Sequence, residues 1–246
     1  MVKIIRSTIF DQFPEVNFGF SPKQALDRPE PFCFNLSLTV GDDEKIVKEN
    51  REAFFNEIGL TASQIAFQRQ IHSDIITVVN KPGVIGESDA LITTKRNIGL
   101  AISAADCTPI FIFDSVNKVI AGVHSGWRGT EKQIVMKTIK KLESEFNSKL
   151  DDLFVYIGPS ISQKFYEVGE EVAGLFNSIY VNKEGCKLYL DVLSVNVDLI
   201  EGYGVPVNQI EISPYCSFQE KNILHSYRRD GKNSGRHLGV ISLKGE

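Results

Sequence analysis

Three residues that could bind a metal ion lie at the ends of strand-like runs in the middle of this sequence. His72 follows QRQI, Cys107 follows ISAAD and His124 follows IAGV. Strand ends can bring side chains to one point, because the sheet holds the backbone rigid. Two imidazoles and one thiolate suit Zn²⁺, and three protein ligands leave a fourth position for water, as in catalytic zinc sites. These residue types predict a three-ligand zinc site.

A structural role for the same residues is also open. Their spacings of 35 and 17 residues match no short zinc motif. Both histidines could be satisfied and half-buried, and Cys107 could be a small buried apolar residue. The neighbouring residues favour a site. Asp106 could accept a hydrogen bond behind the ligands or bind substrate, and the glycines at 126 and 129 let backbone approach a ligand.

Composition limits the class of protein. The chain has 246 residues, a net charge of −4 and 42% hydrophobic residues, which is typical of a globular protein with one large or two small domains. This charge disfavours a nucleic-acid partner, which would need a basic face. Four cysteines without a CxxC pair favour free thiols in a reducing compartment. The N-terminus lacks a signal-peptide pattern, and no apolar run approaches ~20 residues. We therefore expect a cytoplasmic protein that does not span a membrane.

Hydrophobic periodicity predicts many successive strands with helices grouped around them. That order favours an α+β fold with mixed sheets over a strictly alternating parallel fold. Strands are predicted over 2–10, 64–71, 75–79, 90–94, 98–104, 109–114, 119–124, 152–158, 209–213 and 239–243, and helices over 42–58, 131–146, 169–180 and 192–204.

Several blocks of the sequence together resemble the YfiH-like family, also called the laccase-domain or multicopper polyphenol oxidase family. The resemblance runs nearly end to end. Any one block is weak, but the ordered set is highly specific. The blocks are NLSLTVGDD followed by NRE, then RQIHSD, SDALIT, AADCTPIFIFD, AGVHSGWRGT, IGPSISQKFYEVGEEV and SYRRDGKNSGR.

The resemblance implies that His72, Cys107 and His124 bind zinc. It implies one YfiH-like domain over 1–246, an α+β sandwich of mixed β-sheets flanked by helices. It also implies phosphorolysis of adenosine, inosine, guanosine or methylthioadenosine, with adenosine deamination as a second activity. Departures from the residues common in the family are found at three positions, and none removes a ligand: Ser125, Ser217 and His225.

The residues argue against a true multicopper oxidase. A blue copper site alone takes two histidines and a cysteine, and a trinuclear cluster needs several further histidines. The chain has only four histidines, at 72, 124, 225 and 237. Copper binds such sites more tightly than zinc, so copper in place of zinc would account for phenol oxidation.

Purine chemistry makes further demands on the sequence. Deamination suits a zinc-activated water and needs a proton shuttle. Asp106 is the candidate shuttle, ahead of Glu167, which suits a solvated position near a helix start. Phosphorolysis needs groups that hold phosphate, and the arginine fork is suited to this. The candidates are Arg51, Arg128, Arg228 and Arg229.

Several of these assignments have structural alternatives. Arg128 could instead bond nearby carbonyls, and Arg228 could lie in a solvated turn, which is the favoured interpretation of Arg229 because RRDG is a turn signal. Asn35 and Gln70 are candidates for orienting the ribose or the base. The only tryptophan, Trp127, is expected to be a core anchor.

Other functions use the same residues. A metal-free cysteine hydrolase would have Cys107 as nucleophile and a histidine as base. A zinc hydrolase acting on an amide and a laccase-like phenol oxidase are further alternatives. A non-enzymatic binding module would leave the two histidines and the cysteine without a purpose. The sequence does not determine the oligomeric state.

Overall fold

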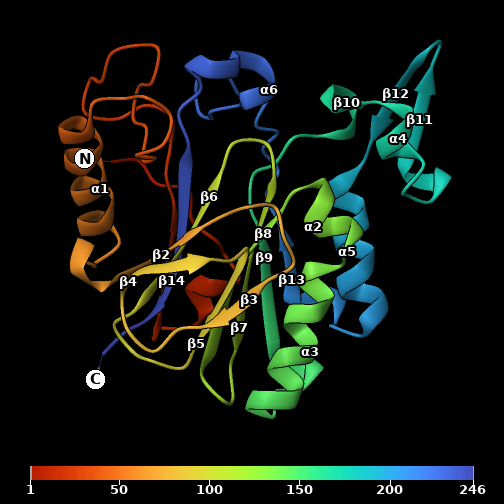
Figure 1. The fold of residues 1–246 in the computed structure, drawn as a ribbon. Helices are drawn as coiled ribbons and strands as arrows, with labels where there is room; N and C mark the ends of the chain where they lie inside the picture. Colours follow the sequence, from red (N-terminus) through yellow and green to blue (C-terminus); the bar gives the residue numbers. More distant parts are fainter. Residues whose placement is uncertain (1, 246) are drawn as a thin grey trace.

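The chain folds into two large β-sheets that pack face to face, with helices on both outer faces (Figure 1). A computed structural model describes residues 2–245. The five-stranded sheet has the order β1-β14-β6-β2-β4, and the six-stranded sheet has the order β13-β9-β7-β8-β5-β3. Each contains parallel and antiparallel pairs. The expected α+β fold with mixed sheets is confirmed.

The bounds of the elements are as follows. The strands are β1 (Val16–Phe20), β2 (Ile65–Arg69), β3 (Ile76–Val78), β4 (Gly83–Glu87), β5 (Ala90–Thr93), β6 (Gly99–Ala104), β7 (Thr108–Asp114), β8 (Val119–Ser125), β9 (Leu153–Ile157), β10 (Glu167–Val168), β11 (Val181–Glu184), β12 (Lys187–Leu190), β13 (Ile210–Ile212) and β14 (His237–Leu243). The α-helices are α1 (Glu44–Glu57), α2 (Trp127–Glu131), α3 (Ile134–Phe146), α4 (Glu170–Ala173), α5 (Val192–Tyr203) and α6 (Tyr227–Asp230). Short 3₁₀ helices occupy Phe10–Gln12, Ala62–Gln64, Leu150–Asp152, Gln163–Phe165, Ser178–Tyr180, Val207–Gln209 and Gly231–Asn233.

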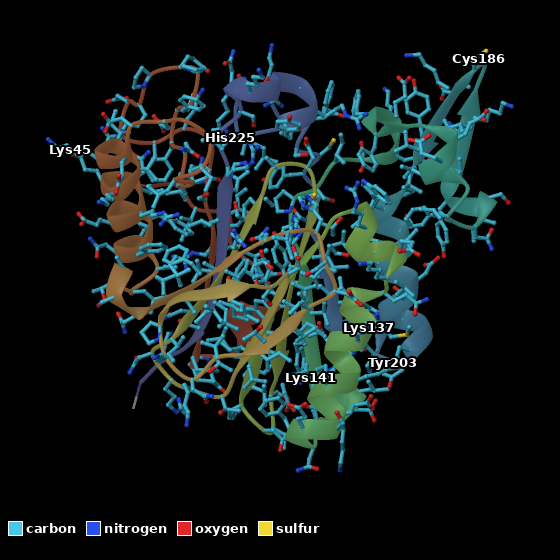
Figure 2. The ribbon with its side chains drawn as sticks, viewed as in Figure 1. Lys45, Lys137, Lys141, Cys186, Tyr203 and His225 are labelled. Carbon is cyan, nitrogen blue, oxygen red and sulfur yellow. The ribbon has the colours of Figure 1, made fainter. Side chains whose placement is uncertain are left out.

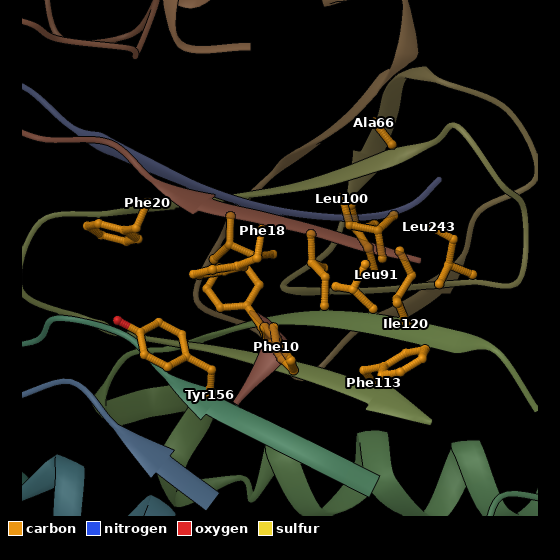
Figure 3. Close-up of a cluster of buried hydrophobic side chains, with 14 of the residues drawn as sticks. Phe10, Phe18, Phe20, Ala66, Leu91, Leu100, Phe113, Ile120, Tyr156 and Leu243 are labelled. Atoms are coloured by element: carbon orange, nitrogen blue, oxygen red, sulfur yellow. The ribbon is translucent and has the colours of Figure 1, made fainter. Parts of the chain in front are cut away.

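The main core fills the space between the two sheets (Figure 3). Phe18 on β1 makes edge contacts with Phe111 on β7 and Tyr156 on β9, with ring centroids 4.9 and 5.0 Å apart. Such aromatic pairs contribute about 0.5–1.5 kcal/mol each beyond the area they bury. A Cβ at Gly239 would lie 2.3 Å from the Phe111 ring, so a glycine on β14 lets the sheets approach this closely.

Two further layers cover the sandwich. Helix α1 packs Phe54 and Phe55 on the outer face of the five-stranded sheet. Its N-cap is Asp43, whose side chain accepts hydrogen bonds from the amides of Lys45 and Ile46. Helices α3 and α5 cover the outer face of the six-stranded sheet. The resulting helix–sheet–sheet–helix order holds the strand ends rigid, which is what a site at those ends requires.

A small arm projects from one end of the sandwich, above α2 and α5 in Figure 1. It consists of residues 163–190, with the three-stranded sheet β10-β12-β11 and helix α4. Its apolar cluster contains Val172 and Leu190, and Trp127 of α2 packs against that cluster. Cys186 lies exposed at the tip of its hairpin (Figure 2). Trp127 therefore anchors the arm, as part of a satellite cluster rather than the main core.

The structure corrects several predicted elements. The predicted strand over 2–10 is reduced to one isolated bridge between Ile5 and Phe20. The helix predicted over 131–146 begins as α2 and is interrupted at Gln133, whose φ of 58° is left-handed. The helix predicted over 169–180 is limited to α4, because the Asn177 side chain caps a separate 3₁₀ turn. Strands β1, β4, β10, β11 and β12 were not predicted.

Among the described residues 2–245, no helix combines the length and the apolar character that crossing a bilayer requires.

Candidate metal centre and active site

The three candidate ligands converge at one end of the sandwich. His72 follows β2, Cys107 precedes β7 and His124 lies near the end of β8. One ligand atom from each residue lies within 4.8 Å of the other two. Nε2 of His72 is 3.9 Å from Sγ of Cys107. Tetrahedral Zn–N and Zn–S bonds of about 2.0 and 2.3 Å would separate two such atoms by about 3.5 Å. The three side chains are therefore spaced to hold one ion.

Local backbone geometry presents His72 and Cys107 at this point. His72 has a φ of 57°, and Asp106, directly before Cys107, has a φ of 98°. Gln70 holds the first turn against β6, because its amide donates to the Ser103 carbonyl at 2.8 Å and accepts from the Ser103 N–H at 2.7 Å. Gln70, predicted to orient ribose or base, thus extends the β2–β6 pairing toward His72.

Asp89 joins the two histidines and was not recognised from the sequence. Its Oδ1 accepts from Nδ1 of His124 at 2.9 Å and from the backbone N–H of His72 at 3.1 Å. Its Oδ2 accepts from the amide and hydroxyl of Ser73 at 2.6 and 2.7 Å. When a metal takes the place of the proton on Nε2 of His124, the bond to Asp89 keeps the remaining ring proton on Nδ1. The only signal was a carboxylate directly before the apolar run ALIT.

The electrostatics of this group favour the ionised carboxylate and thiolate. Burial opposes ionisation of Asp89, but hydrogen bonds from His124 and Ser73 outweigh it and lower its pKa to about 2. Burial also opposes ionisation of Cys107. The His124 charge and hydrogen bonds from His124 and His72 outweigh it and lower the thiol pKa to about 6. A thiolate is the form that binds a metal and also the form that attacks as a nucleophile.

Gly126 makes room for the ligands. A Cβ on this residue would lie 2.8 Å from Sγ of Cys107 and 3.1 Å from Cδ2 of His72. Its φ of −76° suits any residue, so the glycine is required for space and not for backbone conformation. The donor set and this close-fitting space match one zinc-sized ion with nitrogen and sulfur ligands.

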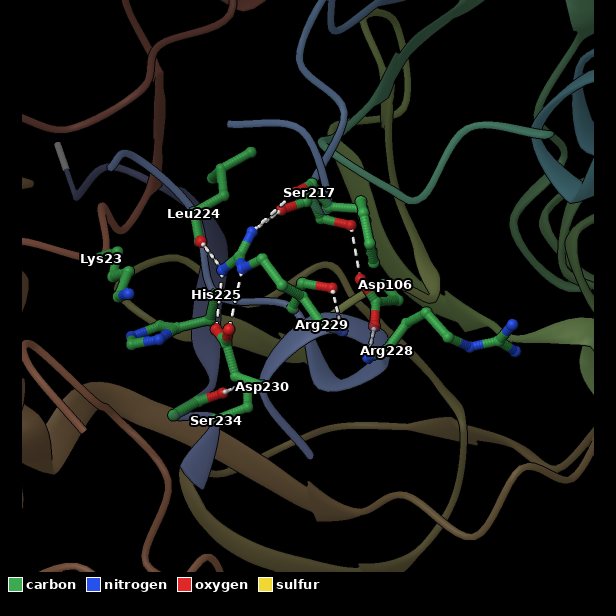
Figure 4. A network of polar contacts seen from close by, with 12 residues as sticks. Lys23, Asp106, Ser217, Leu224, His225, Arg228, Arg229, Asp230 and Ser234 are labelled. Carbon is green, nitrogen blue, oxygen red and sulfur yellow. Dashed lines mark hydrogen bonds and ion pairs between the residues drawn. The ribbon is translucent and has the colours of Figure 1, made fainter. Parts of the chain in front are cut away.

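The Asp106 carboxylate is engaged on both oxygens (Figure 4). Oδ1 accepts from the Ser217 hydroxyl at 2.7 Å, and Oδ2 accepts from the backbone N–H of Arg228 at 2.6 Å. Its carbonyl accepts from the Ile161 amide at 2.9 Å. Asp106 directly precedes Cys107, and its contacts therefore tie helix α6 and the 160–162 segment to the candidate metal centre. Glu167, the other shuttle candidate, is exposed and pairs with Lys187 at 2.8 Å.

The candidate arginines differ in their surroundings. Arg128 is exposed and stacks over Trp127, 4.2 Å from the ring centroid, and within residues 2–245 its guanidinium makes no hydrogen bond or ion pair. Arg228 lies over the Tyr166 ring at 5.0 Å and donates to the Glu167 carbonyl at 2.6 Å. Arg128 thus lacks the carbonyl contacts of its structural alternative, and both guanidiniums are held by aromatic rings.

Arg229 has a structural role, but not as a solvated turn residue. Its guanidinium donates to the carbonyls of Ser217, Phe218 and Leu224, each at 2.8 Å, and pairs with Asp230 (Figure 4). It ties the segment before α6 to that helix. The expectation of a solvated turn residue is therefore wrong for Arg229, because its guanidinium is largely buried against three carbonyls.

Arg51 is on helix α1, and Asn35 lies against that helix. Asn35 is fully buried, its Nδ2 donating to Ser37 and Asp42 and its Oδ1 accepting from the amides of Ser37 and Arg236. Arg51 donates to the Leu36 carbonyl at 2.7 Å and stacks on Phe67. Burial lowers its pKa to about 10. No hydrogen bond within residues 2–245 joins either side chain to the three ligands.

Histidines 225 and 237 form a separate buried pair, with ring centroids 4.8 Å apart. Within residues 2–245, the only group of three or more His, Cys, Asp or Glu side chains that could hold a metal is His72, Cys107 and His124. The described part of the chain thus offers one metal site and no trinuclear cluster.

Comparison with known proteins agrees with this geometry. Residues 19–244 match the family described as multi-copper polyphenol oxidoreductase laccase. The chain belongs to this family. The resemblance inferred from the sequence is confirmed, and the chain is an enzyme.

Relatives of known activity cover most of the chain. A purine nucleoside phosphorylase of Clostridium acetobutylicum is 36% identical over 218 residues, covering 86% of this chain and 87% of that protein. The purine nucleoside phosphorylase YlmD of Bacillus subtilis is 28% identical over 248 residues, covering 94% and 89%. An adenosine deaminase from an unknown prokaryotic organism is 30% identical over 228 residues, covering 85% and 87%.

Solved structures share the fold. The crystal structure of YlmD from Geobacillus stearothermophilus superposes with a TM-score of 0.91 at 25% identity, covering 97% of this chain and 94% of that one. The structure of a Bacillus licheniformis hypothetical protein YfiH gives a TM-score of 0.90 at 28% identity, covering 96% and 94%.

Proposed function

We propose that this chain is a zinc-dependent purine nucleoside phosphorylase that also deaminates adenosine. The observation that carries the proposal is the convergence of His72, Cys107 and His124 in a chain whose relatives are named for these two activities. The substrates proposed are adenosine, inosine, guanosine and methylthioadenosine. Copper is the proposed substitute metal, because it binds such ligand sets more tightly than zinc. Four free cysteines favour a reducing compartment, for which we propose the cytoplasm.

The chain's own residues divide the work in this proposal. Zinc, when bound by His72, Cys107 and His124, would supply Lewis-acid chemistry at that point. Asp89 orients the His124 imidazole so that its Nε2 is available, and it holds the backbone of His72. Gly126 keeps the space before the ligands free of a side chain.

The substrate-holding residues form an outer set. Arg128 and Arg228 hold phosphate, because guanidinium forks bind its oxygens bidentately. The Asp106 carboxylate accepts the backbone N–H of Arg228 and so holds that residue in place. Asp106 is also the residue proposed to move a proton during deamination. Asn35 and Gln70 are proposed to orient the ribose or the base, and Arg51 is proposed as a further phosphate-binding residue.

Phosphorolysis breaks the bond between the purine and C1′ of ribose and forms a C1′–O bond to phosphate. The leaving base takes up a proton, and ribose 1-phosphate is the second product. Deamination instead adds water at C6 of adenine and releases ammonia. From adenosine, phosphorolysis therefore gives adenine and deamination gives inosine. One assay can separate the two reactions by these products.

The test is metal content and turnover of protein purified without added metal. We expect about one zinc per chain, with adenine and ribose 1-phosphate or inosine formed from adenosine in phosphate buffer. Cys107→Ala should lose metal and both activities. Cys186→Ala, at the exposed arm tip, is the matched control and should keep them. Zinc without turnover of any purine nucleoside would overturn the substrate assignment.

A second candidate function rests on one observation. Cys107, His124 and Asp89 are arranged as a thiolate, a base and an orienting carboxylate, which is the order of groups in a cysteine hydrolase. Metal analysis separates the two candidates. A stoichiometric metal bound to Cys107 would exclude the free thiol nucleophile, and turnover in metal-free protein blocked by a thiol reagent would support it.

A further inference from the structure

Two guanidiniums lie over aromatic rings that pack on the arm. Arg128 lies over Trp127, and Arg228 lies over Tyr166. Both rings pack against the same small cluster of the arm, around Val172 and Leu190. The arm therefore brings the two arginines to one side of the site, although 100 residues separate them in the sequence.

Backbone hydrogen bonds fix the position of Tyr166 in the arm. Its backbone N–H donates to the Gln163 carbonyl at 3.0 Å, and its carbonyl accepts from the Leu190 amide at 3.1 Å. On one side of it, Ile161 is bonded to Asp106. On the other side, the Glu167 carbonyl accepts from Arg228. Segment 161–167 is thus held at one end by Asp106, which precedes Cys107, and at the other by Arg228, whose amide bonds Asp106.

The Tyr166 hydroxyl is a donor without an assigned partner. Within residues 2–245 no hydrogen bond is found for it, whereas the hydroxyl of Tyr180 in the same arm donates to Asp198 at 2.7 Å. The charges that act on the Tyr166 phenol are those of Cys107, Arg228, Asp106 and Arg128. Burial comes first among the causes that raise its pKa to about 12, so the phenol is protonated at neutral pH.

We infer that Tyr166 is a ligand of the phosphate co-substrate, completing an oxyanion subsite with Arg128 and Arg228. Two guanidiniums supply the positive charge, and the phenol beneath Arg228 supplies a neutral O–H donor. The one carboxylate among the groups that act on the phenol, Asp106, accepts hydrogen bonds on both oxygens, from Ser217 and the Arg228 amide, and these donors reduce its repulsion of an incoming anion. This inference rests on the proposed phosphorolysis.

The experiment compares Tyr166→Phe with Tyr180→Phe in the full-length, metal-containing protein. Steady-state phosphorolysis is measured with phosphate varied at saturating nucleoside, and then with nucleoside varied at saturating phosphate. Loss of one hydrogen bond to a charged oxyanion should raise the KM for phosphate by about tenfold. The KM for nucleoside should change less than twofold. Tyr180→Phe removes a hydroxyl from the same arm and should match the wild type.

Binding without turnover gives an independent readout. Trp127 is the only tryptophan, and Arg128 lies over its ring. Inorganic phosphate bound by Arg128 should therefore change the fluorescence of Trp127. The midpoint of a phosphate titration should shift about tenfold in Tyr166→Phe and stay unchanged in Tyr180→Phe.

The outcomes separate this inference from the proposed function. Saturable phosphate binding that weakens in Tyr166→Phe, in a protein that turns over no nucleoside, would support the subsite and overturn phosphorolysis. Turnover with wild-type phosphate KM and titration midpoint in Tyr166→Phe would overturn the subsite and leave phosphorolysis standing. A rise in the nucleoside KM alone would also overturn it, because Tyr166 would then contact the nucleoside.

Discussion

The carboxylate of Asp89 and the imidazole of His124 lie 2.9 Å apart, from Oδ1 to Nδ1, and both side chains are buried. The same oxygen accepts the backbone N–H of His72. One side chain therefore orients one imidazole directly and positions the backbone of the other. A carboxylate behind a histidine ligand fixes its tautomer and raises its basicity.

Asp89→Asn should weaken metal binding by about 10–100-fold. The asparagine side chain keeps the size of the carboxylate, but it has only one acceptor oxygen and no negative charge. It therefore bonds the His124 ring and the backbone N–H of His72 more weakly. Competition against a chelator of known affinity measures the change. Asp74→Asn, which removes a half-exposed partner of Lys137, should leave metal affinity unaltered. Equal affinities in the Asp89→Asn variant and the wild type would show that Asp89 is not coupled to the ligands.

Gly126→Ala should lose most of its bound zinc while the fold persists. The new Cβ would lie 2.8 Å from Sγ of Cys107, and that sulfur cannot retreat without leaving the other ligands. Gly202→Ala is the matched control, because nothing lies within 4 Å of the Cβ it would add to α5. Alanine favours a helix interior by about 1 kcal/mol over glycine. Zinc per chain and thermal unfolding of both variants decide the point, and full zinc in Gly126→Ala would contradict it.

Stability should fall as the pH drops below about 6.5, because the folded state keeps two histidines neutral. Burial lowers the pKa of His237 to about 3 and places that of His225 well below 6.5. Three neighbouring groups also disfavour protonation of His225: His237, Lys23 and Arg236. In this window the unfolded chain binds protons that the folded chain excludes. Each such histidine lowers the free energy of unfolding by up to about 1.4 kcal/mol per pH unit.

His225→Phe tests this dependence. Neither ring nitrogen of His225 has a hydrogen-bond partner in the described structure, and the ring is buried (Figure 2 marks its place below α6). An apolar ring there should raise the free energy of unfolding at neutral pH by about 1–3 kcal/mol. It should also reduce the slope between pH 6.5 and 4. Urea unfolding at several pH values measures both, and an unchanged slope would place the proton uptake elsewhere.

Arg128→Ala should mainly lower activity, whereas Arg229→Ala should mainly lower stability. Arg128 contributes only its stacking on Trp127 to the fold, worth about 0.5–1 kcal/mol, so its removal should lower phosphorolysis without lowering stability by more than that. Arg229→Ala leaves three carbonyls without their donors and should lower the free energy of unfolding by at least about 2 kcal/mol. Urea unfolding and kcat/KM, measured together, check the contrast. Equal stability losses would show that Arg128 is structural.

Local pattern was enough to place most central strands and to select the three candidate ligands, which the fold brings together. Strands β5 to β8 each bury a run of apolar residues, and their ends were visible where a polar or glycine residue follows. The arm was misjudged, because its helix is short and its hairpin alternates weakly. Only contact with Trp127 and the small cluster around Leu190 stabilises that segment, and periodicity carries no information about such a partner.

The sequence by itself determined the chemistry available: two imidazoles and a thiolate at strand ends, and a glycine after His124. Tertiary structure decided which groups hydrogen-bond these residues and hold them in position. Antiparallel pairing of β5 with β8 sets Ala90 opposite Val123, and this register brings Asp89 beside His124, 35 residues away. Parallel β2–β6 pairing and the Gln70 clasp position His72 in the same way. Strand register depends on burial of whole sheet faces, so no local pattern around Asp89 could reveal its partners.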